Sequence, residues 1–269
     1  MSSSQKARPA DDESARSTRL GFTSHAPTLA LAQRRALCFA FQPYVDTALR
    51  QVMGYEALVR GAQGEPAGEV FAGVAKTALH AFDVSCRAAA IRQSRKLGIE
   101  QGNALLNLNV LPKALGERGS WLLNTLAVCA SEGFPTSRLV FEITELEHVS
   151  DPASLRDLMR DFREFRFRTA IDDLGAGWSS LELLVELQPD FVKLDIALIS
   201  GIDGDARRRS LIRNLKSACD DLGCLIVAEG VEQAAESRCL DDLGIFQQQG
   251  YLFSRPVIGK LVRDPFFPC

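Results

Sequence analysis

The fold is decided by the stretch FRFRTAIDDLGAGWSS, which covers residues 165–180. Within it, residues 169–171 (TAI) form a short, apolar and partly β-branched run that predicts a buried strand. The strand ends at two adjacent carboxylates, Asp172 and Asp173. Neighbouring carboxylates repel each other unless a cation lies between them. On its own, the stretch fits either a metal-binding strand end or a solvated acidic turn.

Strand-like and helix-like segments alternate along the chain on both sides of this stretch. The candidate strands cover residues 37–42, 52–58, 104–109, 138–143, 167–172, 190–194, 224–229 and 245–250. Helix-length stretches follow most of them, at residues 69–97, 113–132, 153–165, 206–222 and 232–243. Eight strands that alternate with helices predict an α/β fold, a (β/α)8 barrel of the TIM type.

One connection departs from the regular barrel pattern. Residues 43–51 lie between the first two candidate strands and are too few for a crossover helix. Two strands joined by so short a segment pair as an antiparallel hairpin. We therefore expect a modified barrel whose first strand is antiparallel to its neighbour.

Composition narrows the class of protein. The chain has 269 residues, of which 46% are hydrophobic and 24% are charged, as is typical of a soluble globular enzyme. Its net charge of -3 provides no basic field for binding DNA or RNA polymers. None of the 7 cysteines belongs to a C-x-x-C pair, which favours reduced thiols and a cytoplasmic protein.

The start of the chain differs in composition from the remainder. Residues 1–28 are rich in Ser, Arg, Asp and Pro and contain no continuous apolar segment that could enter a membrane. We expect these residues to form a disordered N-terminal tail and residues 29–269 to form the barrel.

Polar side chains stand at or near the ends of the later seven candidate strands. They are Glu56, Asn109, Glu142, Asp172, Lys193, Glu229 and Gln249. Taken singly, any of them could be a surface group or a strand cap. Strand ends of a barrel converge on one face, which holds the active site. Together with Asp173, the set is mostly carboxylates and amides, which suit Mg²⁺ or Mn²⁺ and not zinc.

Seven motifs occur in order along these same strands. They are YEALVR at 55–60, NVLP at 109–112, FEITE at 141–145, IDDLGAG at 171–177, VKLD at 192–195, AEGVE at 228–232 and QGY at 249–251. In letters, order and spacing they resemble the EAL-domain family of cyclic di-GMP phosphodiesterases. The resemblance extends from about Leu37 to Pro256 and implies a barrel with an antiparallel first strand.

The resemblance also implies a site that binds two metal ions. One Mg²⁺ or Mn²⁺ would be held by Glu56, Asn109, Glu142 and Asp172, and a second by Asp172, Asp173 and Glu229. Asn107 lies on the same strand face as Asn109, so either amide could be the ligand.

The remaining roles are implied in the same way. Lys193 would orient the attacking water and Gln249 would help to fix the water and substrate geometry, so that the catalytic set is Glu56, Lys193, Glu229 and Gln249. The substrate would be contacted by Gln42 and Arg60, and the loop after Asp173 would be supported by Glu145 and Glu232.

The expected activity is hydrolysis of cyclic di-GMP to linear pGpG by a water that two metal ions activate. One alternative is a catalytically silent relative that binds cyclic di-GMP or a protein partner, and another is a metal-dependent barrel hydrolase that acts on a different phosphodiester. Silent relatives usually lose a metal ligand or the lysine, whereas every such position is filled here, which favours the enzyme. The resemblance further implies a homodimer that pairs near the loop after Asp173.

Overall fold

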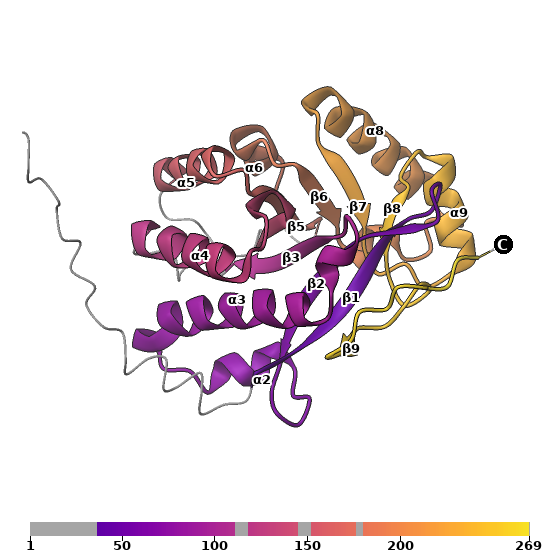
Figure 1. Cartoon of the computed structure of the whole chain (residues 1–269). Coiled ribbons are helices and arrows are strands. Elements are labelled where there is room, and N and C mark those ends of the chain that lie inside the picture. Colours follow the sequence, from indigo (N-terminus) through magenta and orange to yellow (C-terminus); the bar gives the residue numbers. More distant parts are fainter. Residues whose placement is uncertain (1–36, 111–117, 145–151, 176–179, 269) are drawn as a thin grey trace, which may run out of the picture.

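The computed structural model of the chain describes residues 37–110, 118–144, 152–175 and 180–268. These residues form a closed barrel with helices packed around its outer face (Figure 1). The expected boundary between tail and barrel at residue 28 lies outside the described residues, as does Glu145. Among the described helices, none has both the length and the apolar character that a membrane span requires.

Eight strands close the barrel, and a ninth, short strand pairs antiparallel with the first strand. In chain order they are β1 (Cys38–Asp46), β2 (Gln51–Arg60), β3 (Leu105–Val110), β4 (Leu139–Thr144), β5 (Arg168–Leu174), β6 (Phe191–Leu194), β7 (Leu225–Ala228), β8 (Gln247–Gln249) and β9 (Val257–Ile258). Each of the eight candidate strands corresponds to one barrel strand, so the predicted barrel is confirmed.

The predicted hairpin is also confirmed. A turn over residues 47–50 joins β1 to β2, and the two strands pair antiparallel with Gln42 opposite Glu56. On its other edge β1 pairs antiparallel with β8, where Tyr44 lies opposite Gln249. All the neighbouring pairs from β2 round to β8 are parallel. Strand β1 therefore closes the barrel between β2 and β8 and is antiparallel to both.

The helices agree with the expected pattern apart from one break and two additions. They are α2 (Ala67–Ala72), α3 (Leu79–Lys96), α4 (Arg118–Glu132), α5 (Pro152–Glu164), α6 (Ser180–Leu187), α7 (Ile196–Ile199), α8 (Ala206–Leu222) and α9 (Ala234–Asp242). The stretch 69–97 was expected to be one helix, but α2 ends before Gly73, a poor helix former. Helices α6 and α7 were not expected; α7 starts where the Asp195 side chain accepts a hydrogen bond from Ala197 N at 2.8 Å.

The barrel interior is layered because side chains alternate between the two faces of a strand. A lower apolar layer consists of Tyr44, Leu105, Val140, Ala170, Phe191 and Val227. Two residues further along the same strands stand the buried polar groups Asn107, Glu142, Asp172 and Lys193. Glu229 follows Val227 at the same spacing, just beyond the end of β7. The apolar layer, called the apolar plug below, therefore fills the barrel beneath the polar layer and excludes water from that side of the polar groups.

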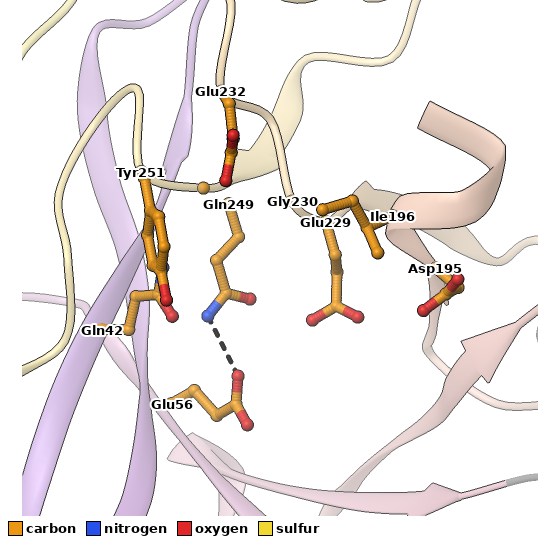
Figure 2. Close-up of a pocket in the computed structure, with 10 residues that line it drawn as sticks. Gln42, Glu56, Asp195, Ile196, Glu229, Gly230, Glu232, Gln249 and Tyr251 are labelled. Carbon is orange, nitrogen blue, oxygen red and sulfur yellow. Dashed lines mark hydrogen bonds between the residues drawn. The ribbon is translucent and has the colours of Figure 1, made fainter. Parts of the chain in front are cut away.

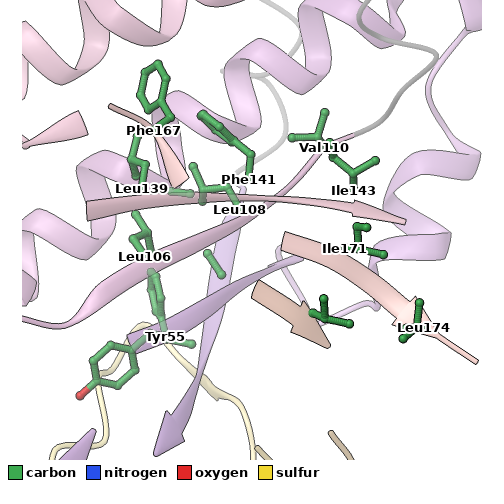
Figure 3. Packing of buried hydrophobic residues seen from close by; sticks show 14 of the residues in the cluster. Tyr55, Leu106, Leu108, Val110, Leu139, Phe141, Ile143, Phe167, Ile171 and Leu174 are labelled. Carbon is green, nitrogen blue, oxygen red and sulfur yellow. The ribbon is translucent and has the colours of Figure 1, made fainter. Parts of the chain in front are cut away.

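The main hydrophobic core lies between the outer faces of the strands and the helices. Figure 3 shows side chains of this cluster, including Phe141 and Phe167. The Phe141 ring lies 5.0 Å from Trp121, 4.8 Å from Phe162 and 5.0 Å from Phe167, measured between ring centroids. Such aromatic pairs add to the stability that burial alone provides. They fix β4, which carries Glu142 on its inner face, against α4 and α5.

Truncation of this aromatic centre should destabilise the whole barrel. Phe141 is 0% exposed, and replacing a buried Phe by Ala typically costs about 3–5 kcal/mol through lost burial and the cavity left behind. We expect Phe141→Ala to lower the free energy of unfolding by that amount in urea titrations. The control Phe246→Ala removes a ring that is 37% exposed and should cost far less. Equal losses for the two variants would contradict the assignment of Phe141 to the core.

Candidate active site

The centre of the polar layer is the ammonium group of Lys193, whose side chain is 3% exposed. Its Nζ lies 2.7 Å from Glu229 Oε1, 2.9 Å from Glu142 Oε1 and 3.0 Å from Asp172 Oδ1. A fourth carboxylate, Glu56 Oε2, lies 3.4 Å away. Three of these carboxylates lie on different strands and Glu229 directly follows a fourth, so the closed barrel is what brings them to one point.

This arrangement leaves a large excess of negative charge. Four carboxylates surround one ammonium, so the ionised cluster carries three uncompensated negative charges before Asp173 is counted. Burying unpaired carboxylates is costly unless cations or protons neutralise them. The site therefore fits added positive charge, and Lys193 alone does not supply enough.

Three amide side chains hold the carboxylates in place. Asn109 Nδ2 donates to Glu56 Oε1 at 3.0 Å, and Gln249 Nε2 donates to Glu56 Oε2 at 3.0 Å. Asn107 Nδ2 donates to Glu142 Oε1 at 2.8 Å. Asn109 is exposed at the barrel mouth, whereas Asn107 is buried below it. The structure thus brings both candidate asparagines to the cluster, at different depths.

Unpartnered oxygens mark where a cation would fit. Among the described residues, no donor reaches Glu142 Oε2, Asn107 Oδ1 or Gln249 Oε1, although all three are buried. Buried acceptors without a donor are rare and call for an explanation such as an ion or water. In addition, ligand oxygens of Asp172, Asp173 and Glu229 lie within 4.8 Å of one another. These oxygens suit a divalent cation of the Mg²⁺ or Mn²⁺ type.

Asp173 reaches the cluster through an unusual backbone conformation. Its φ is 58°, and the pairing of β5 with β6 shifts register between Ile171 and Leu174. An inserted residue of this kind redirects side chains, so both adjacent acids can face the mouth of the barrel. Gly175 follows with φ +107°, where an added Cβ would lie 2.4 Å from Leu198 Cδ1. Glycine is therefore required at this position to let the chain pass α7.

Burial dominates the proton affinities of three carboxylates, Glu142, Asp173 and Glu229. Burial raises the pKa of Glu229 to about 8, against the opposing charge of Lys193. Burial and the adjacent Asp172 raise the pKa of Asp173 to about 6. Burial also raises the pKa of Glu142 well above its usual range. For Lys193 burial acts in the opposite direction, but the surrounding carboxylates prevail and raise its pKa, so it stays protonated.

Two cavities open beside the cluster. The first, of about 360 Å³, is lined by Gln42, Glu56, Asp195, Ile196, Glu229, Gly230, Glu232, Gln249, Gly250 and Tyr251 (Figure 2). The second, of about 380 Å³, has Glu56, Asn109, Asp172 and Asp173 in its wall. The two cavities share Glu56, so the carboxylate layer forms the boundary between them.

Of the other predicted residues that the structure describes, Gln42 and Glu232 line a cavity and Arg60 does not. Gln42 lines the first cavity and its Nε2 donates to Ser254 O at 3.3 Å. Glu232 lines the same cavity. Arg60 lines neither cavity in the described part of the chain, because its Nη1 turns back to donate to Val59 O at 2.8 Å.

Sequence reasoning missed several cavity residues. Ile196 and Tyr251 lie on the wall of the first cavity, and Asp83 and Arg87 lie on the wall of the second. Tyr251 directly follows the Gln249-Gly250 pair, so its position after a strand end was a usable signal. Asp83 and Arg87 lie within α3 and are buried. No strand-end pattern could indicate residues in the middle of a helix.

The raised pKa of Glu229 predicts how stability depends on pH when divalent cations are removed. Its ordinary pKa is 4.5 and its folded value is about 8, so the folded state holds the proton more tightly. The contribution of Glu229 to stability is therefore fully present below pH 4.5 and is lost as pH rises to about 8. We expect the melting temperature in chelator to fall over this window, measured by scanning calorimetry.

Two variants test whether Glu229 causes this fall. Glu229→Gln cannot ionise and should flatten the decrease, whereas Glu132→Gln, which removes a partly exposed surface partner of Arg92, should leave it unchanged. The same decrease in all three proteins would show that another group is responsible.

Comparison with solved structures supports the architecture. The described fold matches a standalone EAL protein from Vibrio cholerae in its c-di-GMP-bound form, with a TM-score of 0.79 and 36% identity. The match covers 85% of this chain and 95% of that one. BlrP1 of Klebsiella pneumoniae, in a calcium and cyclic di-GMP complex, matches with a TM-score of 0.79 and 32% identity over 84% of this chain and 57% of that one.

Comparison of sequences also finds related proteins. The antirepressor BluF of Escherichia coli, which blue light and temperature regulate, is 28% identical over 81% of this chain and 53% of its own length. The cyclic di-GMP phosphodiesterase RocR of Pseudomonas aeruginosa is 36% identical over 56% of this chain and 38% of its own. The chain thus spans about half or less of these relatives. Since the model of the EAL domain matches residues 27–256, the chain belongs to the EAL domain family.

Proposed function

We propose that this chain is a divalent-cation-dependent phosphodiesterase that hydrolyses cyclic di-GMP to linear pGpG. The observation that carries the proposal is the contact of Lys193 Nζ with four carboxylates at the barrel mouth, between two cavities. The RocR relative is named a cyclic di-GMP phosphodiesterase, and structures of similar EAL proteins contain cyclic di-GMP. These findings support the substrate class.

The ligand set would be divided between two cations. Glu56, Asn109, Glu142 and Asp172 would hold the first, and Asp172, Asp173 and Glu229 would hold the second. We choose Asn109 over Asn107 because Asn109 stands in a cavity wall with Glu56 and both aspartates. When bound, such cations neutralise phosphate charge and lower the pKa of a bound water.

Lys193 would orient the attacking water as a hydrogen-bond donor. Because its raised pKa keeps it protonated, it cannot act as a base, but it can donate to the water in place of a carboxylate that a bound cation would take over. Gln249 is the complementary acceptor. Its Nε2 is held by Glu56, which leaves Oε1 free among the described residues to receive a hydrogen from the same water.

The reaction balances with water as the co-reactant. The water oxygen bonds to phosphorus, the bond from phosphorus to the 3′ oxygen of one ribose breaks, and that oxygen takes up a proton. Gln42, on the wall of the first cavity, would contact the substrate. Arg60 would have to leave its contact with Val59 O to reach a phosphate.

A receptor that binds cyclic di-GMP without hydrolysing it is the second candidate. It is supported by the similarity to BluF, which is named an antirepressor. Against it stands the complete set of carboxylates, amides and lysine in the described cluster. A binding site alone would not need an ammonium in contact with four carboxylates.

Turnover with and without metal tests the enzyme proposal. We expect the purified chain to release linear pGpG from cyclic di-GMP in the presence of Mg²⁺ or Mn²⁺, detected by chromatography. Chelator should abolish the reaction, since the cluster then lacks the charge that the substrate phosphate requires. Full activity in a metal-stripped sample would exclude the two-metal assignment, and tight binding without product would favour the receptor.

Two variants should separate the water-orienting role from the metal-binding role. Lys193→Ala keeps every proposed ligand but removes the ammonium, so turnover should fall on the order of 10²-fold or more. It should still bind cyclic di-GMP with Ca²⁺. Glu56→Ala removes a ligand and should weaken both metal-dependent binding and turnover. Titration calorimetry and the product assay measure the two effects.

The matched control is Lys216→Ala. Lys216 lies on α8 and pairs with Asp220 Oδ1 at 2.6 Å, away from the cluster. This variant should retain both binding and turnover. If Lys193→Ala also retained turnover, the proposed role of Lys193 would be wrong.

A further inference from the structure

One buried carboxylate, Glu236, lies outside the metal cluster. It stands in the first turn of α9 and is 4% exposed. Among the described residues, no cationic side chain pairs with it, and both of its oxygens accept hydrogen bonds from backbone amides. A buried polar group needs such bonds to offset the loss of its hydration.

The amides that Glu236 binds belong to two different loops. Oε2 accepts from Gln233 N at 2.9 Å and from Glu232 N at 3.1 Å, both in the loop between β7 and α9. Oε1 accepts from Gly201 N at 2.8 Å, in the turn after α7. Capping of α9 accounts for the bond to Gln233 N alone. The bond to Gly201 N serves no purpose in capping and instead joins α7 to the neighbouring loop.

Residues of the candidate site stand in the β7–α9 loop and at the start of α7. Glu229 and Glu232 belong to the β7–α9 loop, and Ile196 begins α7; all three line the first cavity. Gly230 has a φ of +65°, and a Cβ added there would lie 2.4 Å from Ile196 Cγ1. The β7–α9 loop and the start of α7 are therefore in tight contact directly beside Glu229.

The other side of the β7–α9 loop is held by the backbone of β8. Val231 N donates to Gln249 O at 3.1 Å, and Leu252 N donates to Val231 O at 3.0 Å. These bonds fix the loop against β8, while Glu236 fixes it against α7. The carboxylate of Glu229 must be held from both sides if it is to stay 2.7 Å from Lys193 Nζ.

We infer that Glu236 is a positioning residue for the active site: by bridging the α7 turn and the β7–α9 loop, it holds Glu229 where Glu229 meets Lys193 and a divalent cation. The inference rests on the proposed function of the Glu229 cluster. Supporting groups of this kind change metal affinity or activity without touching the metal, commonly 10- to 100-fold when removed.

The test compares two variants at Glu236 with a capping control. Glu236→Gln keeps the size of the side chain but loses an acceptor oxygen, and Glu236→Asp keeps the charge and the cap but is too short to reach Gly201 N. The control is Asp205→Asn: Asp205 caps α8 by accepting from Arg207 N at 2.9 Å and Arg208 N at 3.1 Å, and it lines neither cavity. All are made in the full chain.

Mn²⁺ affinity, measured by calorimetry without nucleotide, is the first readout. We expect both Glu236 variants to bind Mn²⁺ about 10-fold more weakly or worse, and Asp205→Asn to bind it as the parent does. Turnover at saturating metal should recover in Glu236→Asp, because the ligands themselves are intact. Unchanged Mn²⁺ affinity in both Glu236 variants would overturn the inference.

Hydrogen exchange at individual amides is the second readout, and it does not depend on activity. Faster exchange in Glu236→Asp at Gly201 and at Val231 would support the bridge, whereas a change confined to Gln233 would reduce Glu236 to a helix cap. If the parent bound no Mn²⁺, the proposed function would fail, and exchange at these amides would still decide the role of Glu236. If Glu236→Gln does not fold, Glu236→Asp carries the test.

Discussion

The ion contacts of Lys193 are the interaction on which the rest of the site depends. One ammonium lies within 3.4 Å of carboxylates from β2, β4, β5 and the end of β7. Attraction between such groups is strong where water is excluded, but so is the repulsion among the carboxylates. The arrangement is therefore only partly compensated, and a site with this charge distribution is prepared to take up cations.

The layering of the barrel makes that charge possible. The apolar plug below the cluster, which includes Val140 and Phe191, excludes water from the inner ends of the strands. Water exclusion raises the pKa of Glu142 and Glu229 and strengthens the pull on any cation at the mouth. Stability and function are coupled here, because the same burial that closes the barrel leaves the carboxylates underpaired.

Close backbone contacts supply the precision that the cluster requires. Asp173 adopts a positive φ and Gly175 passes directly beside Leu198. At Gly250 an added Cβ would lie 2.0 Å from Val231 O, so β8 and the loop after β7 lie in backbone contact. Residues in such conformations cost free energy that the surrounding fold must supply. Their concentration around the barrel mouth fits a site in which ligand positions are set by the loops as well as by the strands.

Local sequence pattern is enough to predict the strands, the residues at their ends and the chemical character of the site. Alternation of side chains is a local property, so the strand that carries Asp172 and the hairpin over residues 43–51 could be predicted without any long-range contact. The same pattern placed Glu142 and Lys193 at strand ends, and the motifs extended the prediction to the family.

Which of these groups come into contact depends on long-range pairing of the strands. Glu56 and Lys193 are 137 residues apart, and Glu56 and Gln249 are 193 apart, so their contacts exist only once every strand pairs in register and the barrel closes. The contact of Asn107 with Glu142 and the bridge made by Glu236 to Gly201 join residues that are each 35 positions apart, which no local pattern encodes. The alternation of side chains along a strand determines which face of the sheet a residue points to. Closure of the barrel determines which residues of other strands it contacts.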